Sequence, residues 1–240
     1  MRSTVAVLTP TYSGHAEAWG GAGHELRPVG DLDAADDADI VVLANPNNPD
    51  GRRIAPEQLA AFAARPRRLL VVDEAFCDLH PALSLVPRLS GRAVVLRSFG
   101  KFYGLAGLRL GFVIGAPSVV GGLARLLGAW PVSGPAMAAG IAALADRDWA
   151  DATRRRLAAD RARLDHIIAA AIPGPIAGTD LFRLLRTPRA AALHEALARR
   201  GIWTRIFAED AAAIRIGLPP PEDFPRLESA FAAAAAEAAG

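Results

Sequence analysis

Lysine is almost absent from this chain of 240 residues, because 26 of its 27 basic side chains are arginine. The one lysine, Lys101, lies in the segment RSFGKFYG (97–104). A guanidinium stays protonated at physiological pH, whereas a desolvated lysine amine loses its proton and can attack a carbonyl group to form a Schiff base. Charge alone therefore does not explain Lys101. The alternative is that Lys101 has no function and occurs by chance in an arginine-rich composition. The neighbouring residues decide between a functional and a chance lysine.

Cysteine is equally scarce, since the chain contains only Cys77 and can form no internal disulfide. We expect Cys77 to be a small core residue. The histidines show no metal-ligand spacing, so no structural zinc is expected. They are His15, His24, His80, His166 and His194. These features favour a reducing compartment.

Two further absences exclude whole classes of protein. No apolar stretch approaches the length that spans a bilayer, and the start, MRSTVAVLTP, shows no targeting segment, so we expect a cytoplasmic protein. The sequence pI is about 9.2, but the formal net charge is only +2 and the arginines are scattered. Nucleic-acid binding is therefore not expected.

What the chain does contain is enough apolar sequence for a large core, since 52% of it is hydrophobic and 22% charged. Short apolar runs alternate with helical or loop segments in the first half, a pattern that predicts an α/β domain with a mostly parallel sheet. The helix predicted at 56–65 begins with a proline. The predicted strands cover 4–8, 39–44, 68–73, 93–98 and 109–115.

The pattern changes after residue 115. Helices are predicted at 117–128, 134–146 and 148–171, followed by strand 181–186, helix 188–200, strands 202–207 and 213–217, and helix 221–238. We therefore divide the chain into a large domain (1–129), connecting helices (130–171) and a small C-terminal α+β domain (172–240).

Polar residues follow three of the predicted strands. ANPNNPDG (44–51) follows the second, VVDEAF (71–76) ends the third, and RSFGK (97–101) ends the fourth. Open α/β sheets bind ligands at the carboxyl ends of their strands. Each segment alone would be read as a turn or a helix cap, but together with Lys101 they predict a site. Phe102 after the lysine excludes a P-loop, and no G-x-G-x-x-G follows a strand, so a Rossmann dehydrogenase is not expected.

Four motifs carry a family resemblance. NPNNPDG (45–51), DEAF (73–76), SFGKFYGLAGLRLGF (98–112) and IRIGLP (214–219) resemble the signature of the fold-type I pyridoxal-phosphate enzymes, in the branch that holds histidinol-phosphate aminotransferase and threonine-phosphate decarboxylase. The resemblance implies an aspartate-aminotransferase-like fold, a homodimer and the cofactor pyridoxal 5'-phosphate (PLP). WPVSGPA (130–136) and DLFRLL (180–185) are more similar to the decarboxylase group than to the aminotransferases.

The resemblance also implies roles for residues around the cofactor ring. Lys101 would form the Schiff base, and Asp73 would pair with the ring nitrogen and keep it protonated, so that the ring can accept electrons from the substrate. Asn48 would donate a hydrogen bond to the phenolic oxygen. Tyr12 in PTYSG (10–14) would stack on the ring face.

Three more residues would bind anionic groups. By the same resemblance, Ser98 and Arg109 would hold the cofactor phosphate, and Arg215 would bind the substrate carboxylate. The alternative for both arginines is ordinary surface charge. Apolar residues flank both of them in predicted strands, where an unpaired guanidinium would be costly.

The chain departs from the family pattern in two places. Family transaminases usually carry a tyrosine three residues after the aspartate, whereas this chain has Phe76, which cannot donate to the phenolic oxygen and favours decarboxylation. Family members also carry an upstream segment that helps to hold the phosphate. No such segment precedes residues 4–8, so we expect a large domain without its amino-terminal part and weak binding of PLP. A misplaced start and a true truncation both stay open.

The resemblance implies PLP-dependent decarboxylation of L-threonine O-3-phosphate to (R)-1-aminopropan-2-yl phosphate in cobalamin biosynthesis. The substrate would be a small phosphorylated amino acid. An aminotransferase of the histidinol-phosphate type is the first alternative. The second is a catalytically silent remnant that folds without binding the cofactor.

Overall fold

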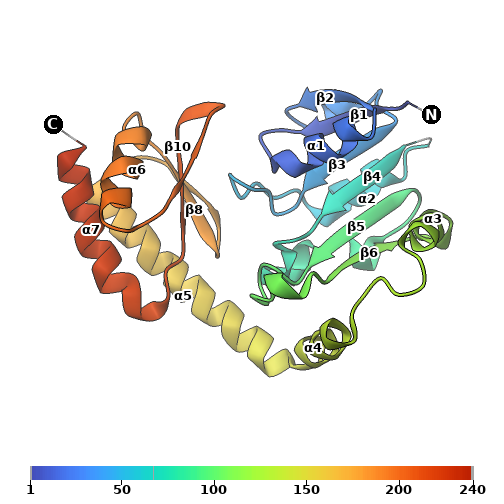
Figure 1. The fold of residues 1–240 in the computed structure, drawn as a ribbon. Coiled ribbons are helices and arrows are strands. Elements are labelled where there is room, and N and C mark those ends of the chain that lie inside the picture. Colours follow the sequence, from blue (N-terminus) through green and yellow to red (C-terminus); the bar gives the residue numbers. More distant parts are fainter. Residues whose placement is uncertain (1, 67, 239–240) are drawn as a thin grey trace. The chain divides into compact units, whose positions relative to one another are not determined.

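The computed structural model describes residues 2–66 and 68–238 (Figure 1). These residues form two compact units, the first ending at Arg147 and the second beginning at Asp148. The division falls inside the range 130–171, which the sequence analysis assigned to connecting helices. One of those helices, α4, belongs to the first unit, and all but the first residue of the next, α5, belongs to the second.

A six-stranded sheet forms the centre of the first unit. Its strands are β1 (Thr4–Leu8), β2 (Glu25–Val29), β3 (Ile40–Ala44), β4 (Leu69–Asp73), β5 (Ala93–Ser98) and β6 (Gly111–Gly115). Their order is β2-β1-β3-β4-β5-β6, and all pairs are parallel except β5 with β6. The predicted mostly parallel α/β sheet is therefore confirmed.

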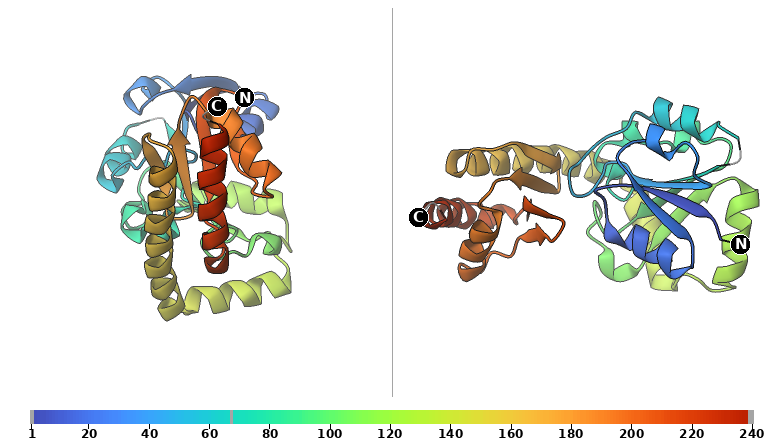
Figure 2. Two further views of the ribbon diagram at one scale, coloured as in Figure 1. Left: turned by 90° about the vertical axis from the view of Figure 1, so that its left-hand side faces the viewer. Right: turned by 90° about the horizontal axis from the view of Figure 1, so that it is seen from above.

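Helices α1 (Ser13–Gly21) and α2 (Pro56–Ala63) cover opposite faces of this sheet. After β6 the chain continues into α3 (Pro117–Leu127), whose Val119 packs on the same face as α1, and then into α4 (Gly134–Ala145). Phe62 of α2 packs on the face that contains Val72 and Val95, whereas Trp19 of α1 packs on the opposite face with Val71. Figure 2 shows the sheet between α2 in cyan and α1 in blue. Since side chains alternate along a strand, neighbouring residues at each strand end point to different faces.

The second unit contains a smaller antiparallel sheet. Its elements are α5 (Arg147–Ala171), β7 (Ile176–Thr179), β8 (Phe182–Arg186), α6 (Ala190–Arg199), β9 (Arg205–Phe207), β10 (Asp210–Gly217) and α7 (Phe224–Glu237). The strand order is β7-β8-β10-β9. Ile214 and Ile216 of β10 belong to one core cluster with Ile168 of α5, Leu193 of α6 and Phe231 of α7.

Among the α-helices and strands of the described residues, three were not predicted from the sequence. These are α1, β2 and β7. In addition, β9 begins at Arg205 rather than at residue 202, and β10 begins at Asp210 rather than at residue 213. Within residues 2–66 and 68–238, no helix combines the length and the apolar character that crossing a bilayer requires.

Candidate active site

The carboxyl ends of four adjacent parallel strands meet at one edge of the first sheet. Tyr12 follows β1, Asn48 follows β3, Asp73 ends β4, and Ser98 ends β5. Because β1, β3, β4 and β5 are neighbours in the sheet, these residues share its carboxyl edge. The structure thus places together four residues that the sequence analysis chose from separate motifs.

Lys101 and Arg109 join the same edge through the segment between β5 and β6. This segment leaves the sheet after Ser98 and returns at Gly111, and these two residues are paired across the antiparallel strands. Lys101 and Arg109 lie between them, so they belong to the connection at this edge. Of the seven predicted residues, Arg215 alone lies in the second unit.

The Asp73 carboxylate has two close neighbours. Its Oδ1 accepts a hydrogen bond of 2.9 Å from the backbone N–H of Ala75, and its Oδ2 lies 3.1 Å from Nε2 of His15. The second contact has the distance of an ion pair but not the alignment of a hydrogen bond, because the buried Nε2 has no hydrogen-bond partner among the described residues. Asp73 is therefore held at a fixed place beside an imidazole.

No role for His15 was predicted from the sequence. It follows Tyr12 by three residues at the start of α1, and the two rings meet edge-on with centroids 5.6 Å apart. Residues at this spacing lie on one face of a helix, which is the signal that links His15 to Tyr12. Tyr12, His15 and Asp73 thus form a continuous row of contacts.

Lys101 is exposed on a turn that buried aromatic residues anchor. Its Nζ lies 5.7 Å from the ring centroid of Phe76, close enough for a cation–π contact. The carbonyl of Lys101 accepts a bond from the N–H of Gly104, whose φ of 68° favours glycine. Phe99 is 2% exposed and stacks on Tyr103 with centroids 4.5 Å apart. The lysine amine is accessible while its backbone is fixed.

Buried asparagine side chains organise the loop that carries Asn48. Asn47 accepts a bond of 2.7 Å from the Thr11 hydroxyl, and its amide donates to the Pro10 carbonyl at 2.8 Å and to Asp50 at 2.7 Å. Thr11 and Pro10 directly precede Tyr12. Asn47 therefore ties the segment that presents Tyr12 to the loop that presents Asn48.

Ser98 and Arg109 provide a hydroxyl and a guanidinium at the same edge. The Ser98 Oγ accepts a bond of 3.1 Å from the N–H of Gly100, so its own proton stays available for another acceptor. Arg109 is exposed and has a φ of 53°, a left-handed conformation that is uncommon for residues other than glycine. One Nη of Arg109 donates to the carbonyl of Ala106 at 3.1 Å.

Arg215 occupies the central part of the second unit's sheet. It pairs with Arg205 across β9 and β10, and its guanidinium lies 5.2 Å from the ring centroid of Phe182. Burial, and secondarily the charge of Arg205, lowers the pKa of Arg215 from its usual value. Like charges directly across a sheet repel each other, so an anion beside the two guanidiniums would be stabilising. Arg205 was not predicted from the sequence, because only the strand register brings it next to Arg215.

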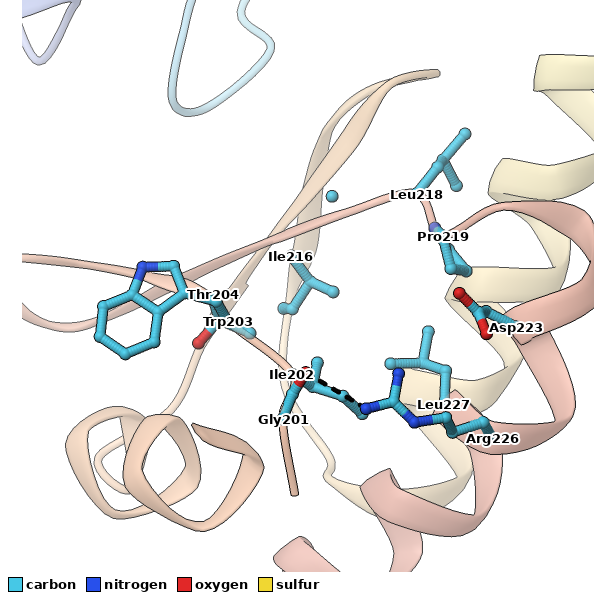
Figure 3. A pocket seen from close by; sticks show the side chains of 11 residues that line it. Gly201, Ile202, Trp203, Thr204, Ile216, Leu218, Pro219, Asp223, Arg226 and Leu227 are labelled. Carbon is cyan, nitrogen blue, oxygen red and sulfur yellow. Dashed lines mark hydrogen bonds between the residues drawn. The ribbon is translucent and has the colours of Figure 1, made fainter. Parts of the chain in front are cut away.

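The second unit contains a cavity of about 240 Å³, and Arg215 is not among the residues that line it (Figure 3). Gly201, Trp203 and Arg226 are among its lining residues, and Arg226 donates to the carbonyl of Gly201 at 3.2 Å. Ile216 lines the cavity and Arg215 does not, because adjacent residues of β10 point to opposite faces. None of the residues predicted from the sequence lines this cavity.

Together, the first unit's edge presents an accessible amine, a carboxylate, an amide, an exposed aromatic ring, a hydroxyl and a guanidinium. This set can bind a small aromatic molecule that carries an anionic group. The family model described as aminotransferase class I and II matches residues 2–227. The chain belongs to this family. The predicted membership of an enzyme family is thereby confirmed.

Relatives in the class I and II aminotransferase family include proteins with two different activities. A threonine-phosphate decarboxylase of Pseudomonas aeruginosa is 45% identical over 95% of this chain and 71% of its own length. One from Sinorhizobium is 44% identical over 90% of this chain and 66% of its own length. A histidinol-phosphate aminotransferase of Mycobacterium tuberculosis is 35% identical over 95% of this chain and 66% of its own length. The chain thus spans about two thirds of the length of these relatives.

Solved structures of the family share the fold. The histidinol-phosphate aminotransferase of Sinorhizobium meliloti in complex with pyridoxal-5'-phosphate has a TM-score of 0.88 and 28% identity, covering 98% of this chain and 71% of its own. A Thermus thermophilus aspartate aminotransferase variant has a TM-score of 0.79 and 20% identity, covering 97% of this chain and 70% of its own. The aspartate-aminotransferase-like fold predicted from the sequence is confirmed.

Proposed function

We propose that the chain is a PLP-dependent lyase that decarboxylates L-threonine O-3-phosphate to (R)-1-aminopropan-2-yl phosphate, a step of cobalamin biosynthesis. The observation that carries the proposal is the similarity to proteins named threonine-phosphate decarboxylase, at 45% and 44% identity. Identity to the protein named histidinol-phosphate aminotransferase is lower, at 35%.

The residues at the carboxyl edge of the first sheet fit PLP. The accessible amine of Lys101 suits its aldehyde, and the carboxylate of Asp73, fixed by Ala75, suits its ring nitrogen. Tyr12 is 56% exposed and so leaves a ring face available for stacking. Ser98 and Arg109 supply donors for the phosphate.

When bound, PLP supplies an electron-accepting ring that lets a bond at the substrate α-carbon break. Lys101 would hold the cofactor covalently through its amine. Asp73 would keep a proton on the ring nitrogen, and the N–H of Ala75 would hold the carboxylate in place, with His15 beside Oδ2. Asn48 would donate to the phenolic oxygen, a role that Phe76 cannot share because it has no hydroxyl.

We assign the substrate's carboxylate to Arg215. Its guanidinium is buried enough to lower its pKa and lies on the same face as Arg205. Charge-assisted bonds from arginine to a carboxylate or a phosphate are geometrically specific. A substrate with two anionic groups would therefore be stabilised by this pair of guanidiniums.

The second candidate function is transamination, which the relative named histidinol-phosphate aminotransferase supports. The two reactions are distinguished by their products. We expect the protein with PLP and L-threonine O-3-phosphate to release carbon dioxide in step with the amino product and to consume no 2-oxo acid. Consumption of an added 2-oxo acid without release of carbon dioxide would favour the aminotransferase. Absence of both reactions would contradict the proposal.

We also propose that the protein is a homodimer, as the family resemblance implies. Large apolar side chains are exposed on and between α3 and α4 in the first unit, including Leu126 at 85%, Trp130 at 92% and Ile141 at 71%. Exposed apolar patches of this kind mark interaction surfaces. We expect sedimentation to show a dimer that the double variant Trp130→Ser/Ile141→Ser weakens, whereas Trp203→Ser, in the second unit, serves as a control. A monomer at all concentrations would refute this assignment.

The single cysteine favours a reducing compartment such as the cytoplasm. Cys77 is fully buried, and burial raises the pKa of its thiol to about 12, so it is a core residue without reactive character. The expectation of a small core residue agrees with this burial, while the compartment itself stays a prediction.

A further inference from the structure

Glu74, the second residue of the DEAF motif, has no part in the proposed chemistry, yet its environment is unusual. Its side chain is 0% exposed. Its carboxylate accepts bonds from the backbone N–H of Leu85 at 2.6 Å and from the Ser84 hydroxyl at 2.8 Å, and it lies 3.0 Å from an Nη of Arg97. A buried carboxylate is costly unless it is paired in this way.

Arg97, the first residue of the RSFGK segment, bridges several acceptors. One Nη donates to the Ser84 Oγ at 3.0 Å while lying beside Glu74, and the other donates to Asp78 at 2.8 Å. Its buried Nε has no hydrogen-bond partner among the described residues. The guanidinium is therefore fixed by its two ends, between two carboxylates.

This network lies on the reverse side of the candidate active site. The N–H of Glu74 donates to the carbonyl of Leu96 at 2.9 Å, which joins β4 to β5 next to their carboxyl ends. Because side chains alternate, Glu74 and Arg97 point to the α2 side of the sheet, while their chain neighbours Asp73 and Ser98 point to the other side. A shift of either strand end would move both sides together.

We propose that the Arg97–Glu74 pair is a positioning device that fixes Asp73 and Ser98 for cofactor binding. The inference rests on the proposed function. Stability alone is a poor explanation for the pair, since buried ion pairs can often be replaced by apolar residues without loss of stability. An apolar pair makes no directional bonds and so cannot fix the spacing of the backbone segments around it. The guanidinium bonds in defined directions, and it therefore sets the distance between the end of β5, the end of β4 and the segment at Ser84.

The test compares Arg97→Lys with a control, Arg88→Lys. Lysine keeps the charge but cannot reach Glu74, Ser84 and Asp78 at once. Arg88 forms an exposed pair with Glu57 on the same side of the sheet, at 2.6 Å. Without cofactor, we expect Arg97→Lys to raise amide hydrogen exchange at Ala75 and Gly100 about tenfold or more, with mid-strand amides unchanged.

The amides of Ala75 and Gly100 report directly on the positions of Asp73 and Ser98, to which they donate. In a PLP titration, we expect Arg97→Lys to weaken binding by about ten- to a hundredfold, which corresponds to about 1.4–2.8 kcal/mol of binding free energy. The control should match the parent protein in both measurements.

A second variant keeps the proposal testable if Arg97→Lys does not fold. Glu74→Gln/Arg97→Met removes both charges. The one amide oxygen can still accept from the N–H of Leu85, and the amide N–H can donate to the Ser84 hydroxyl. We expect its urea midpoint to stay near that of the parent while exchange at Ala75 and Gly100 rises. Exchange that rises equally at all amides, or parent-like exchange and PLP binding in both variants, would overturn the proposal. Failure of the parent to bind PLP would refute the proposed function, while the exchange result would still decide whether the pair positions the strand ends.

Discussion

Replacing Lys101 by arginine is expected to abolish both turnover and covalent retention of PLP while the fold stays intact. Arginine keeps the positive charge near Phe76 but has no amine that can attack an aldehyde. The loss of turnover should be on the order of a thousandfold or more, as for other residues that act as nucleophiles. Rates of carbon dioxide release from L-threonine O-3-phosphate measure the effect.

The urea midpoint of the Lys101→Arg variant serves as the control. Lys101 is exposed, and substitutions at such positions usually change stability by less than about 0.5 kcal/mol. An unchanged midpoint with lost turnover would assign the effect to chemistry. Near-normal turnover in this variant would mean that Lys101 has no catalytic role and occurs by chance in an arginine-rich chain.

Asp73→Asn is expected to cause the second largest loss. A carboxylate about 4 Å from a protonated ring nitrogen stabilises it by roughly 4 kcal/mol at an effective dielectric constant of about 20. Loss of that charge should lower turnover by about three orders of magnitude, at 1.4 kcal/mol per tenfold. The measurement is kcat at saturating PLP.

The Asp73→Asn variant keeps the local backbone hydrogen bond, because its Oδ1 can still accept from the N–H of Ala75. Near-normal kcat would therefore show that Asp73 acts only as an acceptor for that backbone group. His15→Phe offers a graded comparison, since it keeps an aromatic ring against Tyr12 and removes the nitrogen beside Oδ2. We expect a smaller loss than for Asp73→Asn.

The sequence predicted the buried strands well because their apolar runs are continuous. β1 and β5 have the predicted bounds, and β4 begins one residue later than predicted. β2 was missed because Pro28 interrupts it and most of its residues are partly or fully exposed, as edge position allows. α1 was missed because its sequence, SGHAEAWGG, is rich in glycine and lacks an apolar stripe. Packing on the sheet, rather than local propensity, determines both elements.

The residues of the candidate site likewise divide into those that the sequence indicates and those that only the tertiary structure brings together. Asn48, Asp73, Ser98 and Lys101 could be chosen from the sequence, because each follows or ends an apolar strand within a recognisable motif. Other contributions arise only from tertiary contacts. His15 reaches Asp73 through one turn of an unpredicted helix, Arg205 meets Arg215 through strand register, and Glu74 and Arg97 meet across β4 and β5.

Because the chain contains a single lysine, one measurement shows directly whether that lysine binds PLP covalently. The protein is incubated with PLP, reduced with borohydride, digested and mapped by mass spectrometry. We predict that the reduced cofactor is found on the peptide that contains Lys101, and that Lys101→Arg lacks it. Cofactor found only on the amino-terminal amine, or on no peptide of the parent protein, would contradict the claim that Lys101 holds PLP.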